Sequence, residues 1–162
     1  MIAIVSDTHM PRGGRRIPET CLRQLRAAEL ILHAGDIAAA EILRALEALG
    51  APVLAVAGNV DEPVLRHELP TQRVVEHAGA RIGMVHDAGA RIGRLGRLRQ
   101  RFPDCHAVVF GHSHIPLIEH DEEGFTIVNP GSPTERRRAS THTMALASAG
   151  SGGLEVQLVS LD

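Results

Sequence analysis

Three short apolar runs in the first third of the chain each end in polar residues: IAIVSDTH (2–9), LILHAGD (30–36) and PVLAVAGN (52–59). Apolar runs of this length, bounded by polar residues or glycine, are typical of buried strands. Between the runs, apolar residues recur at helical spacing in 19–29 and 39–49. The order is therefore βαβαβ, which predicts a parallel sheet with right-handed crossovers.

The rest of the chain predicts shorter strands and one more helix. Two runs, 73–77 and 81–86, flank an Ala-Gly-Ala turn and indicate a hairpin. Residues 91–102 have apolar residues on one helical face, and an apolar strand is expected at 107–111. Turn sequences separate four further short strands, at 117–119, 125–129, 143–147 and 154–161. We predict one α/β domain over residues 1–162, with two sheets flanked by helices.

The composition is that of an ordinary globular chain: 44% of the 162 residues are hydrophobic and 22% are charged. No apolar run approaches the ~20 residues of a membrane helix, and the first residues lack a signal-peptide pattern. Two cysteines fit a reducing compartment, so we expect a cytoplasmic protein without a membrane partner. The net charge of −2 and an aromatic content of 2% argue against binding of long nucleic acid.

Residues that can bind metal ions follow five of the predicted strands. They are Asp7 and His9, Asp36, Asn59, His86, and His112 with His114. Successive motifs lie about one strand and crossover apart, so their side chains should meet at the carboxyl edge of the sheet, where ligands bind in open α/β folds. Because alternate residues of an extended segment share a face, the two Asp-x-His and His-x-His pairs should each point the same way.

The types of these residues indicate which ligand they bind. Imidazole, carboxylate and amide donors without thiolates favour manganese, iron, zinc or nickel over calcium. Seven donors exceed the need of one tetrahedral ion and fit two ions that share a bridging carboxylate, Asp36. Two ions roughly 3.5–4 Å apart can clamp a phosphoryl group and generate a hydroxide between them. Each residue alone has a structural explanation, such as a turn, but the five motifs together favour a metal site.

The order of the motifs resembles the signature of calcineurin-like metallophosphoesterases: Asp-x-His (7–9), Gly-Asp (35–36), Gly-Asn-x-Asp (58–61), His (86) and Gly-His-x-His (111–114). The short chain and its Asn-Pro-Gly-Ser segment (129–132) are similar to the small YfcE-type phosphodiesterase branch. This resemblance implies a four-layer αββα sandwich with two divalent ions, for which we expect manganese, with iron, zinc or nickel as alternatives. It places one ion on Asp7, His9, Asp36 and His114 and the other on Asp36, Asn59, His86 and His112.

We therefore expect a metal-dependent phosphoesterase, and specifically a phosphodiesterase, acting on a small phosphoester. A hydroxide bridging the ions would attack phosphorus in line, with Asp36, Asn59 and His86 as the catalytic ligands and no covalent nucleophile. The alternatives are a protein-binding scaffold on the same fold, as in the retromer subunit of this superfamily, and a phosphomonoesterase or nuclease. Fold alone does not decide between them, but the complete ligand set favours an enzyme. The sequence leaves open whether the protein forms a homo-oligomer.

Three features depart from the family pattern. Val60 stands where larger members carry a histidine that protonates the leaving group, so water or the substrate must supply that proton. Asp87 replaces the usual glycine and adds a carboxylate near the site. The Gly-Asp motif also lacks the Asp-Arg that follows it in protein Ser/Thr phosphatases, which disfavours that activity.

Three further residues are candidates for supporting the ligands. His33 either donates a hydrogen bond to a ligand or is purely structural, and Asp87 adds a carboxylate beside His86. Asp61 either orients Asn59 or shapes the turn into Glu62-Pro63, and we favour the turn. The run Arg136, Arg137 and Arg138 either binds substrate phosphate or forms a solvated face, and we favour the solvated face.

Overall fold

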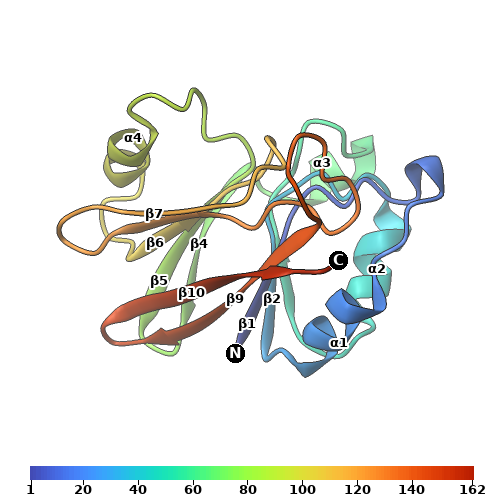
Figure 1. Ribbon diagram of the computed structural model, residues 1–162, viewed down its shortest axis with the longest axis horizontal. Helices are drawn as coiled ribbons and strands as arrows, with labels where there is room; N and C mark the ends of the chain where they lie inside the picture. The colour runs from blue at the N-terminus through green and yellow to red at the C-terminus, as the bar shows by residue number, and fades with distance from the viewer.

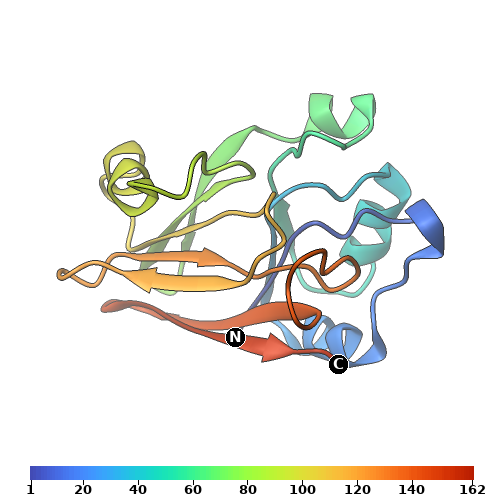
Figure 2. The ribbon, with the colours of Figure 1, turned by 45° about the horizontal axis from the view of Figure 1, so that its top comes forward.

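A computed structural model describes all 162 residues and shows two five-stranded sheets packed against each other (Figures 1 and 2). The first sheet contains β1 (Ile2–Val5), β2 (Leu30–His33), β3 (Val53–Ala55), β9 (Thr143–Gly150) and β10 (Gly153–Ser160). Its order is β10-β9-β1-β2-β3, and β1, β2 and β3 run parallel. The βαβαβ prediction for the first third is confirmed, and β9 adds to this parallel core antiparallel to β1.

The second sheet is built from the middle of the chain. It contains β4 (Gln72–His77), β5 (Ala80–Val85), β6 (Ala107–Val109), β7 (Leu117–His120) and β8 (Thr126–Asn129). The order is β4-β5-β6-β8-β7, with β5, β6 and β8 parallel and the predicted β4–β5 hairpin at one side.

Helices cover the outer faces of both sheets. Figure 1 shows α1 (Glu19–Ala27) and α2 (Ala40–Glu47) outside the first sheet, and α4 (Arg94–Arg101) outside the second. The four-layer αββα sandwich is therefore confirmed. None of the helices has the length and apolar composition needed to cross a bilayer.

The strand β1 shows why its sequence is apolar throughout. Ile2 and Ile4 belong to the core between the two sheets, whereas Ala3 and Val5 pack under α1 and α2. A strand that is covered on both faces gains from apolar residues at every position, so alternation is lost.

Several predicted boundaries are wrong. The helix predicted at 91–102 begins only at Arg94, because Gly93 has a left-handed backbone (φ 70°) and residues 87–93 form a loop. The apolar run at 52–59 forms a strand of only three residues, and β9 runs on to Gly150 in a hairpin with β10. The sequence also gave no sign of α3 (Pro63–Glu68), whose six residues are too few to show a helical period.

Candidate metal centre

The five motifs meet at the carboxyl ends of parallel strands from both sheets. Asp7 and His9 follow β1, Asp36 follows β2 and Asn59 follows β3, while His86 and the pair His112 and His114 follow β5 and β6. The structure brings six of these residues into two compact groups of three. Within each group the ligand atoms lie within 4.8 Å of one another, and Asn59 lies against the second group.

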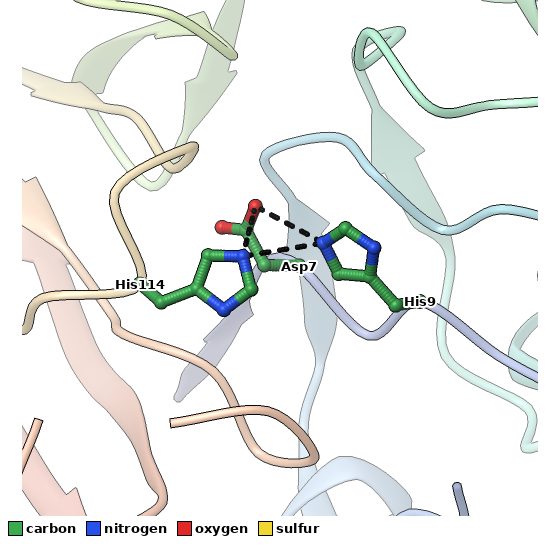
Figure 3. A group of neighbouring side chains, drawn as sticks. All are labelled: Asp7, His9 and His114. Atoms are coloured by element: carbon green, nitrogen blue, oxygen red, sulfur yellow. Dashed lines mark hydrogen bonds and ion pairs between the residues drawn. The ribbon is translucent and has the colours of Figure 1, made fainter. Parts of the chain in front are cut away.

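The first group consists of Asp7, His9 and His114, and all three side chains are buried (Figure 3). The Nε2 atoms of His9 and His114 are 3.2 Å apart. The Oδ1 atom of Asp7 lies 3.4 Å from Nε2 of His114 and 3.8 Å from Nε2 of His9. Two ring nitrogens and one carboxylate oxygen thus face a common point.

The second group consists of Asp36, His86 and His112, with Asn59 between the two imidazoles. The Nε2 atom of His86 is 3.2 Å from Oδ2 of Asp36 and 3.1 Å from Oδ1 of Asn59. The same amide oxygen is 3.1 Å from Nδ1 of His112. Unlike the first group, this one is open on one side, because Asn59 is exposed and the His112 side chain is 47% exposed.

Asp36 lies between the two groups. Its Oδ1 atom accepts a hydrogen bond from the backbone N–H of Val60 at 2.9 Å, which fixes the orientation of the carboxylate. Its Oδ2 atom faces both groups, at 3.5 Å from Nε2 of His9 and 3.2 Å from Nε2 of His86. One carboxylate oxygen therefore faces candidate ligands of both groups, so Asp36 could contribute to both.

Backbone carbonyls fix the tautomers of two histidines. Nδ1 of His86 donates to the carbonyl of Ala34 at 2.7 Å, and Nδ1 of His114 donates to the carbonyl of Glu135. In the neutral ring each Nε2 then carries a lone pair that points at other acceptor atoms. Converging lone pairs and carboxylates repel one another unless a cation lies among them, so these residues fit a pair of metal ions.

The pKa of His86 reflects the same electrostatics. Burial lowers this pKa, but the hydrogen bond to the Asp36 carboxylate and the charges of Asp7 and Asp36 outweigh burial and raise it to about 8. The carboxylates around His86 therefore favour a positive charge at this end of the site.

The prediction that each histidine pair points one way is wrong for His112 and His114, which join different groups. The backbone of these loops is not extended: φ is positive at five of the seven candidate ligands, Asp7, His9, Asp36, His112 and His114. Positive φ is uncommon for residues with a side chain and persists where the surrounding structure imposes it. Left-handed turns, and not strand alternation, aim these side chains.

Glycines in the motifs leave room for the carboxylates. A Cβ atom at Gly58 would lie 2.1 Å from Oδ1 of Asp36, and one at Gly111 would lie 1.9 Å from the hydroxyl of Ser6 and 2.6 Å from Oδ2 of Asp7. No such contact is tolerated, so the glycines of the Gly-Asn and Gly-His motifs allow the close approach of neighbouring loops.

The three predicted supporting residues behave differently from one another. His33 is fully buried, accepts the N–H of Gly35 at Nδ1 and contacts the hydroxyl of Thr8 through Nε2, so it joins two loops without touching a candidate ligand. Asp61 accepts the backbone N–H groups of Ala38 and Gly58, so it holds the loops of Asp36 and Asn59 and not the Asn59 side chain. Asp87 is exposed, and its Oδ2 atom lies 4.0 Å from Nε2 of His112.

A segment late in the chain, residues 132–135, packs against the first group, although none of the metal-binding motifs includes it. Glu135 lies beside His9, with Oε2 3.8 Å from Nε2, and pairs with Arg15 at 2.9 Å. Ser132 donates to the carbonyl of Asp7 at 2.8 Å, and Thr134 donates to that of Thr8 at 2.7 Å. The only signal was the Asn-Pro-Gly-Ser segment that precedes these residues.

The arginine run divides between two environments. Arg136 donates to the carbonyls of Ala139 and Ser140 in its own turn, whereas Arg137 reaches the carbonyl of His112 at 3.5 Å. Arg138 is exposed, as expected for a solvated face.

Comparison with known proteins identifies the family. The sequence profile of the calcineurin-like phosphoesterase superfamily domain matches residues 1–152. The chain belongs to this superfamily. A probable metallophosphoesterase of Methanothermobacter thermautotrophicus is 38% identical over 151 residues, which cover 90% of this chain and 84% of the relative. The resemblance seen in the sequence is thus confirmed, and the family is that of metal-dependent phosphoester hydrolases.

Solved structures show the same fold. Vps29 of Entamoeba histolytica, in complex with Zn²⁺, matches with a TM-score of 0.77 at 21% identity, covering 99% of both chains. A structure described as a novel archaeal phosphodiesterase matches with a TM-score of 0.75 at 18% identity, covering 98% of this chain and 99% of that one. At such identities the likeness concerns the architecture alone, and both a phosphodiesterase and Vps29 share it.

Proposed function

We propose that this protein is a phosphodiesterase that acts on a small phosphoester in the cytoplasm. It would hold two divalent ions, for which manganese is the first candidate. The observation that carries the proposal is the position of Asp36 Oδ2, 3.5 Å and 3.2 Å from histidine nitrogens of the two groups. Asp7, His9, Asp36 and His114 would hold one ion, and Asp36, Asn59, His86 and His112 the other. When bound, such a pair activates water at neutral pH and offsets the charge that develops on the phosphoryl oxygens.

The side chains of this chain orient that chemistry. The Val60 amide fixes Asp36, and the Ala34 and Glu135 carbonyls fix the tautomers of His86 and His114. The exposed Asn59 and His112 form the side from which a phosphoester can approach. Ser6 is buried and donates to Asp7 at 2.6 Å, so it is not placed to act as a nucleophile.

The leaving group receives no proton from position 60. Val60 has no titratable group, and its carbonyl accepts a hydrogen bond from Arg12 at 3.3 Å. A positioned general acid contributes about 10²–10⁴-fold to such a reaction. We therefore expect fast cleavage of aryl diesters, whose leaving groups are weakly basic, and slow cleavage of alkyl diesters.

A scaffold function is the competing proposal, since Vps29 shares the fold. The complete set of seven candidate ligands supports the enzyme. Because a Vps29 structure also holds Zn²⁺, metal binding alone does not separate the two proposals, and the hydrolysis assay does.

The test combines metal analysis with a pair of model esters. Protein purified without chelator should contain two ions per chain, should hydrolyse bis-p-nitrophenyl phosphate faster than p-nitrophenyl phosphate, and should lose this activity in chelator and regain it with manganese. Asp36→Asn should strongly reduce both metal content and turnover. Asp104→Asn, at an exposed carboxylate outside the metal centre and the adjoining pocket, serves as the matched control that keeps both. One ion per chain would contradict the paired site, and full activity in chelator would contradict metal dependence. Faster cleavage of the monoester would exclude the diesterase proposal.

A further inference from the structure

A pocket of about 370 Å³ adjoins the open side of the second group. Asn59, His86 and His112 form its inner end, and Arg66 of α3 and Arg101 of α4 lie at its sides together with Thr71. Neither arginine belongs to the metal centre, and the sequence motifs include neither of them. A volume of this size lies in the range of small-molecule sites.

The two arginines are free to bind an anion. The guanidinium of Arg66 is exposed and has no hydrogen bond or ion pair within the chain. Arg101 uses only Nε, which donates to Gln72 at 2.8 Å, so its two terminal nitrogens have no acceptor. By contrast, Arg99 on the same helix is paired with Asp121 at 3.1 Å.

The pocket contains one acidic side chain, Asp87, which is turned toward other partners. Its Oδ1 atom accepts the N–H of Gly89 at 2.8 Å, and its Oδ2 atom faces His112 at 4.0 Å. The pocket thus has two guanidinium groups and only one carboxylate, which already contacts other groups, so its side-chain charge is positive. A guanidinium binds phosphate or carboxylate through paired N–H donors, which makes it selective for such groups.

We infer that this pocket is a second-anion subsite: it binds a phosphate or carboxylate on the same small molecule whose phosphoester lies at the metal centre. The inference rests on the proposed function, since it takes the metal centre as the place of the reacting phosphate. The substrate class is then an organic phosphoester that carries a further anionic group, and cationic head groups are disfavoured. Arg66 and Arg101 determine this specificity without taking part in the reaction.

The experiment measures binding, so that it does not depend on turnover. Manganese-loaded protein is titrated by calorimetry with three phosphomonoesters that share the phosphate and differ at the far end: propyl phosphate, propane-1,3-diol bisphosphate and choline phosphate. We expect the bisphosphate to bind about tenfold more tightly than propyl phosphate at low salt, and choline phosphate to bind more weakly. The advantage of the bisphosphate should fall to about threefold or less in Arg66→Gln and in Arg101→Gln.

Arg99→Gln is the matched control and should keep the full preference, because Arg99 pairs with Asp121 and Glu123 and does not line the pocket. Any binding of manganese by the bisphosphate itself is the same for all variants, so differences among variants report on the arginines. Equal affinities for the bisphosphate and propyl phosphate, or a preference that survives both substitutions, would overturn the subsite. Absence of diester hydrolysis together with the expected affinities would overturn the proposed function and leave the subsite standing.

Discussion

Asp61 is the residue whose replacement tests the architecture of the metal centre most directly. It is 3% exposed, and its two oxygens accept the backbone N–H groups of Ala38 at 2.8 Å and Gly58 at 2.6 Å. These amides belong to the loops that carry Asp36 and Asn59. Asp61→Asn keeps the shape of the side chain but places an NH₂ group against one of the two N–H groups, so one buried donor loses its acceptor.

Two opposing effects set the magnitude. An unsatisfied buried N–H costs about 1–3 kcal/mol. Burial raises the pKa of Asp61, while the two backbone hydrogen bonds lower it. The buried charge is therefore partly unfavourable, and removing it in Asp61→Asn offsets a part of the free energy lost with the hydrogen bond. We expect Asp61→Asn to lower the free energy of unfolding by about 2 kcal/mol, which corresponds to a fall of about 4–8 °C in the melting temperature of a chain of this size.

The assay is urea denaturation of chelator-treated protein followed by circular dichroism, so that loss of metal binding does not contribute. A separate competition with a metal-binding dye should show that manganese affinity falls by about 10–100-fold, as for other groups that hold ligands in place. Asp87→Asn is the control, because this exposed carboxylate should change the unfolding free energy by less than about 0.5 kcal/mol. If Asp61→Asn is as stable as the unmodified protein and binds manganese equally well, the two backbone contacts do not hold the loops.

Three more predictions follow from the geometry. Asp36→Asn should reduce hydrolysis of bis-p-nitrophenyl phosphate on the order of tenfold more than His9→Ala, because Oδ2 of Asp36 faces both groups; equal losses would rule out a shared carboxylate. Gly111→Ala should lower the metal content of purified protein, because its Cβ atom would meet the Ser6 hydroxyl at 1.9 Å; an unchanged content would show that the loops yield freely. Burial lowers the pKa of His33 from 6.5 to about 4, so its contribution to stability is complete above pH 6.5 and is lost toward pH 4, by up to about 3 kcal/mol. Urea denaturation of chelator-treated protein between pH 4 and 7 should show this loss, and His33→Gln should flatten it.

The early part of the fold could be read from the chain because its strands are covered on both faces. Continuous apolar runs such as residues 2–5 and 30–33 mark such strands, and helical spacing marks α1 and α2 between them. The six residues of α3 carried no comparable signal, since they span less than two helical turns. The start of α4 depended on the left-handed turn at Gly93, which has no periodic signature.

By itself, the sequence determined which residue types stand at the ends of the strands, and therefore the chemistry of the candidate ligands and the family. The family resemblance already implied how these ligands divide. Only the tertiary structure decided the turns that aim them, because His112 and His114 take positive φ values that the packing of neighbouring loops imposes. The same holds for Glu135, which lies beside His9, and for Arg66 and Arg101, which line the adjoining pocket, because no local pattern connects their segments with the site. Local sequence encodes hydrophobic period and donor type, whereas contacts across many residues arise only when the two sheets pack together and bring their loops to one edge.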